Sequence, residues 1–478
     1  MLWLCLHFPQ LPLELHSRAE TAASPWGLTE GKGTRRSILL CNTLAAACGI
    51  HPGMTPGTAY ALAADLHLRD RDEAAERQAL ESLAAWAMQF TSLVSLLPPL
   101  ALLLEIGGSS HLFKGVEALL RRVQQCATQL GYVIELGVAP TPLGAWLLAR
   151  APHRKPVTRP DALIAALCDL PLSLLDLDDQ LLRRLRGLGL RNIGELLCLP
   201  RAGLARRFGP QLLDHLDRLL GLRPDPRLPF QPPPCFQQRI LLSAETLDHK
   251  GLLFPAWRLL LELAGMLTGR QTGTQRLRWT LGHPRRSATV ITLELAAPNH
   301  DPQHFLHMLR ERLMRLTLDH PVESLELVVT DIRSLQPTHL ALDGSQSVPT
   351  LEWPRLVERL RARLGDEAVH GLQCHPDHRP EQAWRSAPPG AAVTFCAHAA
   401  RPLWLLLDPV VLEHLNGNPW LGERLYIEAD PERIESGWWD DGGIARDYFI
   451  ARDGAFARYW IFRERTGERR WFLHGLFA

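Results

Sequence analysis

Between residues 236 and 333 the chain alternates between strand-like and helix-like segments in an order that strongly limits the fold. The predicted elements are a strand over 236–242, a helix over 252–267, strands over 275–281 and 288–295, a helix over 303–316 and a strand over 322–331. Asp301 and Pro302 supply an N-cap and a proline at the first helical position. This stretch therefore predicts a β-α-β-β-α-β unit.

The second of these strands carries a row of positive charge. Its period of two places Arg276, Arg278 and Thr280 on one face, with Leu277, Trp279 and Leu281 on the other. Arg285 and Arg286 follow in the turn. These arginines lie in a region with an excess of positive charge. Residues 181–290 hold 18 Arg and Lys against 7 Asp and Glu, whereas the net charge of the whole chain is +1. A polyanion partner is predicted for this part, and a solvated polar face is the alternative.

A glycine-rich turn lies in the helical stretch before this unit. The sequence 185–194 places Gly187 and Gly189 around one leucine, with Arg183, Arg184 and Arg191 beside them. Glycines at such a turn let backbone N–H groups approach a phosphate at a helix N-terminus. We interpret it as a helix-hairpin-helix that binds DNA phosphate, with an ordinary glycine turn as the alternative. A proline-rich linker follows over 223–234.

Together with the amino-terminal segments, these features resemble Y-family translesion DNA polymerases. The segments are 1–7, 48–54, a strand over 97–108, a helix over 115–130 and the run 136–146. The resemblance implies an α+β right-hand fold, with palm and fingers over 1–160, a helical thumb over 161–234 and a βαββαβ little finger over 235–333. It also implies binding to primer-template DNA.

The family's catalytic residues are missing from this palm. Two acids of the first strand fall on Cys5 and His7, and an Asp-Glu pair falls on Leu100 and Ala101. Two-metal phosphoryl transfer needs carboxylates that share two Mg²⁺ ions, and these side chains do not provide them. Cys5 and His7 share one face of a strand, but no second Cys/His pair lies nearby in the sequence, so packing roles are predicted rather than a metal site.

The positions that hold the triphosphate in the family have changed in the same way. The fingers Tyr and Arg fall on Thr43 and Ala46, and the palm lysines fall on Pro142 and Trp146, while Glu105 matches a structural acid. We therefore predict a polymerase homologue without activity, metal or cofactor. An active polymerase with relocated metal ligands is one alternative, and a plain DNA-binding repair factor is another.

The carboxyl-terminal part begins with a predicted linker over 334–352 and a helix over 353–364, and ends in a strand-rich, aromatic tail. The motifs at 432–440, 446–451 and 471–477 resemble the ImuB family, the inactive Y-family homologues of bacterial SOS mutagenesis cassettes. The resemblance implies an adaptor in translesion synthesis that binds the β sliding clamp, a RecA-like ImuA protein and an error-prone DnaE-type polymerase. We predict a β-rich partner-binding region over 353–478, with Trp471, Phe472, Leu476 and Phe477 only partly buried.

Clamp-binding peptides present two apolar anchors from an extended segment. Three segments come near the Gln-x-x-Leu-Phe consensus: 10–13, which we expect to be buried, 227–230, and 339–343. The third, with His339, Leu340 and Leu342, lies in the predicted linker and is our candidate, although it lacks the Gln and the Phe.

Composition narrows the setting of the protein. The nine cysteines form no CxxC pair, which argues against a zinc site or a disulfide framework. No uninterrupted apolar run of about 18 residues and no signal peptide is present. We expect a cytoplasmic protein that associates with the nucleoid after DNA damage and not with a membrane.

Overall fold

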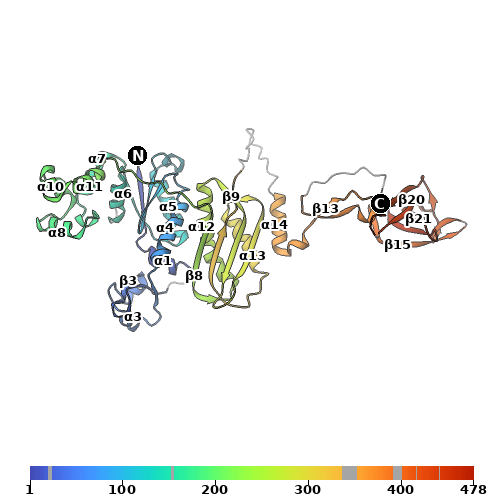
Figure 1. Ribbon diagram of the computed structural model, residues 1–478, viewed down its shortest axis with the longest axis horizontal. Helices are drawn as coiled ribbons and strands as arrows, with labels where there is room; N and C mark the ends of the chain where they lie inside the picture. The colour runs from blue at the N-terminus through green and yellow to red at the C-terminus, as the bar shows by residue number, and fades with distance from the viewer. Residues whose placement is uncertain are drawn as a thin grey trace. The chain divides into compact units, whose positions relative to one another are not determined.

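The computed structural model describes residues 1–19, 24–151, 155–335, 352–390, 401–415, 417–440 and 442–477. Two compact units, Met1–Arg363 and Leu364–Ala478, make up the chain (Figure 1). The two units are treated separately below.

The predicted palm is an antiparallel four-stranded sheet with helices on both faces. The sheet has the order β5-β6-β1-β7. Its strands are β1 (Trp3–His7), β5 (Val94–Leu97), β6 (Ala101–Glu105) and β7 (Glu135–Ala139), and its helices are α1 (Leu11–Ser17), α4 (Glu73–Ala87), η2 (Ser110–Phe113), α5 (Val116–Leu130) and α6 (Pro142–Arg150). Strand alternation divides the core, because Leu4 and Leu6 pack with α4 and α5, whereas Trp3 and Cys5 pack with α6. In Figure 1, α6 lies on one side of β1, and α4 and α5 lie on the other.

The single strand predicted over 97–108 is two strands. β5 ends at Leu97, a turn follows over 98–100, and β6 begins at Ala101 and pairs back onto β5. Pro98 and Pro99 carry no backbone N–H, so they cannot continue a hydrogen-bonded ladder and they end the strand.

The fingers form a small separate sheet of order β3-β2-β4. Its elements are β2 (Trp26–Glu30), η1 (Gly33–Arg35), β3 (Ser37–Cys41), α2 (Thr43–Ala47), α3 (Pro56–Leu62) and β4 (His67–Asp70). Ile38, Ala45, Ile50, Ala59 and Leu66 form most of its core.

The thumb is helical, as predicted, and shares one core with the α6 face of the palm. Its helices are α7 (Pro160–Cys168), η3 (Leu172–Leu174), α8 (Asp179–Gly187), α9 (Ile193–Leu197), α10 (Arg201–Phe208) and α11 (Pro210–Leu220). The proline-rich linker then passes along the palm, where the Phe230 N–H donates to the Val94 carbonyl of β5 at 2.7 Å. The Phe230 side chain packs against the cores of both palm and little finger.

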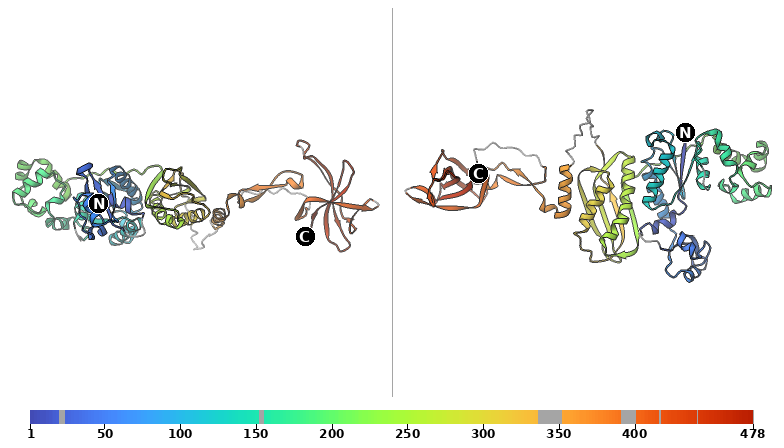
Figure 2. Two further views of the ribbon diagram at one scale, coloured as in Figure 1. Left: turned by 90° about the horizontal axis from the view of Figure 1, so that it is seen from below. Right: turned by 180° about the vertical axis from the view of Figure 1, so that it is seen from behind.

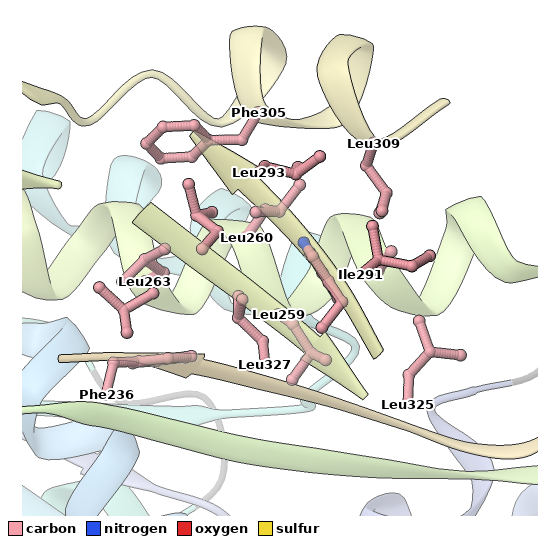
Figure 3. Close-up of a cluster of buried hydrophobic side chains, with 14 of the residues drawn as sticks. Phe236, Leu259, Leu260, Leu263, Ile291, Leu293, Phe305, Leu309, Leu325 and Leu327 are labelled. Carbon is pink, nitrogen blue, oxygen red and sulfur yellow. The ribbon is translucent and has the colours of Figure 1, made fainter. Parts of the chain in front are cut away.

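The little finger has the predicted βαββαβ order. Its elements are β8 (Phe236–Thr246), α12 (His249–Gly269), β9 (Thr272–Gly282), β10 (Thr289–Asn299), α13 (Pro302–Leu313) and β11 (Val322–Val329), with a short β12 (Ile332–Ser334) added. The sheet order is β10-β9-β11-β8. Figure 3 shows Leu259 and Leu260 of α12 and Phe305 and Leu309 of α13 meeting the inward residues of the strands, so both helices cover one face. Figure 2 shows the same layering from behind.

Helix α12 lies unusually close to α4 of the palm. A Cβ at Gly265 would lie 2.3 Å from Trp86 Cδ1, and one at Gly269 would lie 2.7 Å from the carbonyl carbon of Met88. Within the described residues α12 is also the one helix long and apolar enough to suit a membrane, but 61% of that span is buried inside the protein. Its apolar surface therefore serves the core of the little finger and the contact with the palm.

The helix predicted at 353–364 is α14 (Glu352–Leu364). Its Glu358 carboxylate lies 2.8 Å from Nε2 of His304 in α13, so most of the helix joins the first unit. The compact carboxyl-terminal unit thus starts at Leu364, eleven residues after the predicted boundary at 353.

The carboxyl-terminal unit is β-rich, as predicted. Its elements are η4 (Asp366–Ala368), β13 (Gly371–Cys374), η5 (Pro380–Gln382), β14 (Trp384–Ala387), β15 (Trp404–Leu415), β16 (Asn418–Leu421), β17 (Glu423–Arg424), β18 (Tyr426–Ile427), β19 (Glu432–Ser436), β20 (Ile444–Arg452), β21 (Arg458–Glu464) and β22 (Trp471–Leu476). The main sheet follows β17-β16-β15-β22-β21-β20-β18, with β19 on β20. Its strands fan out at large angles in Figure 2, which shows a strong twist.

Catalytic positions and candidate nucleic-acid interface

Cys5 is a core residue. It pairs with Leu103 of β6 and Gly137 of β7, and its side chain is 0% exposed. Burial raises the pKa of the Cys5 thiol well above its ordinary range, so the neutral thiol persists. The Cys5 side chain packs in the core that the palm sheet shares with α6 and the thumb.

His7 stands two residues further along the same strand face and is held by neighbours on both sides. Its Nδ1 lies 3.1 Å from Oε2 of Glu135 in β7, and its ring meets the ring of Trp146 edge-on at 5.2 Å. Burial lowers the pKa of His7, although the Glu135 carboxylate acts in the opposite direction. His7 therefore packs as a largely neutral imidazole.

Trp146, at a position where the family has lysine, fills the space beside His7. The Arg150 guanidinium stacks on its indole at 4.2 Å, and the indole Nε1 donates to the carboxylate of Asp176 from the thumb. Arg150 Nη1 also donates to Asp176 Oδ1 at 2.7 Å. The approach of α6 depends on Gly137, where a Cβ would lie 2.2 Å from the Ala145 oxygen.

Other family positions, Leu100, Ala101, Thr43 and Ala46, carry no charged side chain. Ala101 is 0% exposed, and the Leu100 carbonyl accepts a backbone bond from Phe8 at 2.8 Å. Thr43 and Ala46 are exposed residues of α2 without charge. Among the residues that the structure describes, no group of three or more His, Cys, Asp or Glu side chains is placed to hold a metal ion.

Glu105 has the structural role predicted for it. Its Oε1 accepts hydrogen bonds from the backbone N–H groups of Leu2 and Gly107, each at 3.1 Å. The carboxylate thus closes the end of the β1–β6 pair.

The predicted hairpin lies between α8 and α9, with an open backbone at its glycines. Gly189 has a φ of +86°, and a Cβ at Gly187 or Gly189 would meet nothing within 4 Å. Sequence reasoning missed Glu195, whose Oε2 accepts from the Arg191 N–H at 2.6 Å and from the Asn192 N–H at 3.4 Å. A carboxylate of the protein therefore already occupies two amides at the start of α9.

The hairpin arginines differ in their freedom to reach a phosphate. Arg184 donates to the Arg207 carbonyl at 2.8 Å and lies over the ring of Phe208, and Arg183 Nε donates to the Asp179 carbonyl within its own helix. The Arg191 side chain is exposed. Their roles in DNA binding stay predictions.

The arginine row of the little finger lies on the outer face of the sheet, opposite α12 and α13. Leu277, Trp279 and Leu281 are buried in the core, which confirms the predicted alternation. Arg276 and Arg278 project from the other face, and Arg276 Nη2 is 2.8 Å from Oε1 of Glu294.

Three other arginines of this surface are better placed than Arg276 to contact a polyanion. Arg278, Arg285 and Arg286 are exposed and have no ion pair or hydrogen bond within the described ranges. Arg285 has a φ of +53° in the tight β9–β10 turn. The turn itself is fixed by the buried His283, whose ring nitrogens lie 2.9 Å from the Pro321 carbonyl and 2.8 Å from Thr289 Oγ1.

Of the four terminal residues predicted to be partly buried, Trp471 is the one that departs from the prediction. Trp471 is 5% exposed and belongs to the core of the module, so its expected partial exposure is wrong. The reason is its pairing with Leu412 of β15, which turns its side chain inward. Phe472 and Phe477 are half-buried, and Leu476 is 36% exposed.

Other aromatics of this module are far more exposed, among them Trp438 and Trp439 between β19 and β20, at 84% and 60%. The sequence held a signal for them, because two consecutive tryptophans followed by Asp-Asp-Gly indicate a turn in which both side chains cannot point into one core.

Two of the three clamp-peptide candidates cannot present both of their apolar anchors. Leu11 and Leu13 are 0% and 2% exposed, as expected for the first peptide. Phe230 of the second peptide is packed between two cores, although Leu228 is 89% exposed. His339, Leu340 and Leu342 lie outside the described residues, so this candidate stays a prediction.

Comparison with known proteins places these features in context. Residues 12–150 match the family model described as impB/mucB/samB family. The chain is 29% identical over 461 residues to Protein ImuB of Caulobacter vibrioides strain NA1000 / CB15N, which spans 90% of this chain and 100% of that protein. Protein ImuB of Caulobacter vibrioides strain ATCC 19089 / CIP 103742 / CB 15 gives the same figures.

Solved structures of polymerases are also similar. A ternary complex of Dbh is 15% identical with a TM-score of 0.38, and DinB from Sulfolobus solfataricus is 16% identical with a TM-score of 0.37. Each match covers 70% of this chain and 100% of the solved chain.

Proposed function

We propose that this chain, which is similar to Protein ImuB over 90% of its length, is a polymerase homologue that acts as a non-catalytic adaptor in SOS-induced translesion synthesis. In this role it binds primer-template DNA and the β sliding clamp in the cytoplasm. It recruits a RecA-like ImuA protein and an error-prone DnaE-type polymerase, which supplies the nucleotidyl transfer.

The observation that carries the proposal is the side-chain environment of the palm sheet. The positions of the family acids hold Cys5, His7, Leu100 and Ala101, and Trp146 packs against His7 where substrate contacts would be needed. Asp176, a thumb carboxylate that accepts from the Trp146 indole, is paired with Arg150. A two-metal transfer requires at least two carboxylates that converge on open space, and this arrangement supports binding without chemistry.

DNA binding in this proposal rests on the exposed arginines of the little finger and the open hairpin of the thumb. Both features suit contacts to phosphates, which are independent of base sequence. The Arg276–Glu294 pair and the Glu195 carboxylate reduce the number of free donors. The proposal therefore assigns most of the electrostatic contact to Arg278, Arg285 and Arg286.

A primer-extension assay tests the catalytic part. The purified full-length protein, incubated with primer-template DNA, the four dNTPs and Mg²⁺ or Mn²⁺, is expected to add no nucleotide, while a competent Y-family polymerase under the same conditions extends the primer. Extension that co-purifies with the chain through several columns would support an active polymerase with relocated metal ligands and overturn the proposal.

A pull-down tests the adaptor part. The full-length chain is expected to retain the clamp, the ImuA protein and the DnaE-type polymerase, each added in purified form. If the chain binds DNA but retains none of the three proteins, the result would instead support a plain DNA-binding repair factor.

A further inference from the structure

Two neighbouring tryptophans form the tip of the β19–β20 turn in the carboxyl-terminal unit. Trp438 is 84% exposed and Trp439 is 60% exposed, and their rings meet edge-on with centroids 5.5 Å apart. Other aromatic residues of this sheet, such as Tyr448, Trp460 and Phe462, are buried at 2% exposure or less. The exposed pair thus contributes little to the core of the module.

The turn that carries the pair is firmly braced. Arg379, from the segment before η5, donates from Nη1 and Nη2 to the two carboxylate oxygens of Asp440, each at 2.8 Å. The same guanidinium is held by Asp377 Oδ2 at 2.8 Å and lies 5.9 Å from the Trp439 ring. A planar guanidinium with two bidentate partners fixes the geometry of the loop.

The backbone of the turn adds to this brace. The Gly442 N–H donates to Asp440 Oδ1 at 2.9 Å, and the Asp440 N–H donates to the Gly437 carbonyl at 3.2 Å. Gly437 has a φ of +82°, and a Cβ there would lie 2.6 Å from Arg379 Nη1. The two indoles are therefore presented from a rigid support, which reduces the entropy lost when a partner covers them.

The charge beside the indoles indicates the chemistry of the partner. Asp377 and Asp440 both pair with Arg379 beside the two indoles, so these three described side chains together carry one net negative charge. A net negative tip repels nucleic-acid phosphates and attracts basic side chains. Exposed tryptophan is also the residue most enriched among the hot spots of protein interfaces.

We propose that Trp438 and Trp439 are the anchors by which this module docks into an apolar pocket, rimmed by Lys or Arg side chains, on a protein partner. This inference rests on the proposed adaptor function and assigns recruitment to the braced turn rather than to the terminal strand that holds Trp471.

The test compares variants of the full-length chain for binding to the ImuA protein and to the DnaE-type polymerase, measured separately by surface plasmon resonance. The double variant Trp438→Ala/Trp439→Ala is expected to weaken one of these complexes by about 100-fold or more, as for two hot-spot residues. Trp404→Ala is the matched control, because Trp404 is 69% exposed in the same unit but lies outside the braced turn, and it should change the affinity less than about threefold.

Two further variants separate docking from folding. Trp438→Ala alone removes the more exposed indole and should keep the unfolding temperature while weakening the complex about tenfold or more. Arg379→Ala keeps both indoles but removes their brace, so it should also weaken the complex. Raised salt should weaken the wild-type complex, because the turn that carries the tryptophans is negative and the rim of the proposed pocket on the partner is positive.

The outcomes distinguish this inference from the function on which it rests. If both proteins bind the double variant as tightly as the unaltered chain, the docking inference is wrong and the adaptor function stands. If neither protein binds the unaltered chain, both fail. A loss of self-association or of DNA affinity in the double variant, with partner binding unchanged, would assign the pair to a second copy or to nucleic acid and would also overturn the inference.

Discussion

The Arg18 guanidinium of the palm donates a hydrogen bond to the Glu262 carboxylate of α12, and the two side chains are only 3% and 2% exposed. Arg18 also donates to the Tyr132 hydroxyl, and Ser82 Oγ donates to Glu262 Oε2 at 3.2 Å. This polar cluster lies beside the close contact of Gly265 with Trp86. The little finger is thus joined to the palm by a buried charge pair as well as by apolar packing.

Removing one member of this pair should destabilise the protein strongly. Glu262→Ala leaves the Arg18 charge buried without its partner, and a loss of about 3–5 kcal/mol in the free energy of unfolding is expected. Chemical denaturation of the full-length protein measures it. The control is Asp161→Ala, which breaks a pair with Arg159 that is 64% and 77% exposed and should cost less than about 1 kcal/mol. Equal losses in the two variants would show that the buried pair does not join the subdomains.

Replacing a glycine at the contact between α12 and α4 should destabilise the protein. Gly265→Ala places a methyl group against the Trp86 ring and should destabilise the protein by about 1–3 kcal/mol through overpacking. Gly203→Ala, in α10, is the control, because its Cβ would meet nothing within 4 Å. It should instead stabilise the protein by about 0.5–1 kcal/mol, since alanine favours the helix. A stabilising Gly265→Ala would contradict the close approach of α12 and α4.

Stability should fall with rising pH because of Glu14. Burial raises the pKa of Glu14 to about 7, although the Val133 N–H donates to its Oε1 at 2.9 Å. Since the folded pKa is raised, the stabilisation is fully present below the unfolded pKa, about 4.3, and is lost as the pH rises through the folded value.

The variant that checks this dependence is Glu14→Gln. Between about pH 4.5 and pH 7.5, ionisation of Glu14 should lower the free energy of unfolding by an amount on the order of 3 kcal/mol, and this variant should lack that decrease. Urea denaturation at several pH values measures the change, with Glu117→Gln on the exposed face of α5 as the control. An unchanged slope in Glu14→Gln would mean that another group governs the decline.

DNA binding should depend on salt through three arginines in particular. Replacing Arg278, Arg285 and Arg286 together by alanine should reduce the slope of log K against log salt by up to about 2.7, at roughly 0.9 for each lost phosphate contact. Arg276→Ala alone should have a smaller effect than any of these single changes, because Glu294 already neutralises that side chain. Fluorescence anisotropy with a primer-template duplex measures both. A triple variant with the wild-type slope would show that this face does not contact DNA.

Local patterns were enough to predict the little finger. Its apolar spacing switches between strand and helix periods, and Asp301 with Pro302 marks the start of α13, so each element could be identified from neighbouring residues. Glu195 was open to the same reasoning, because Asn192 and Glu195 have the spacing of a capping box.

Long-range contacts were not available from the sequence. The burial of Trp471 depends on its pairing with Leu412, and the Arg18–Glu262 bond joins residues 244 positions apart. The contact of Asp176 with Trp146 and Arg150 depends in the same way on how the thumb packs against α6. Periodicity shows which face of an element is apolar but does not show which element will cover it.

The packing of Trp146 against His7 opposes the introduction of metal-binding carboxylates into this part of the palm sheet. An aspartate introduced at Cys5 or Ala101 would be a carboxylate buried in an apolar core, which costs several kcal/mol before any metal can bind. The Trp146 indole would still fill the space beside His7. Replacing Trp146 would remove the group that donates to Asp176 and on which Arg150 stacks. Because each of these single changes is harmful, selection can alter the exposed surfaces of this chain far more easily than it can build a metal site in this sheet.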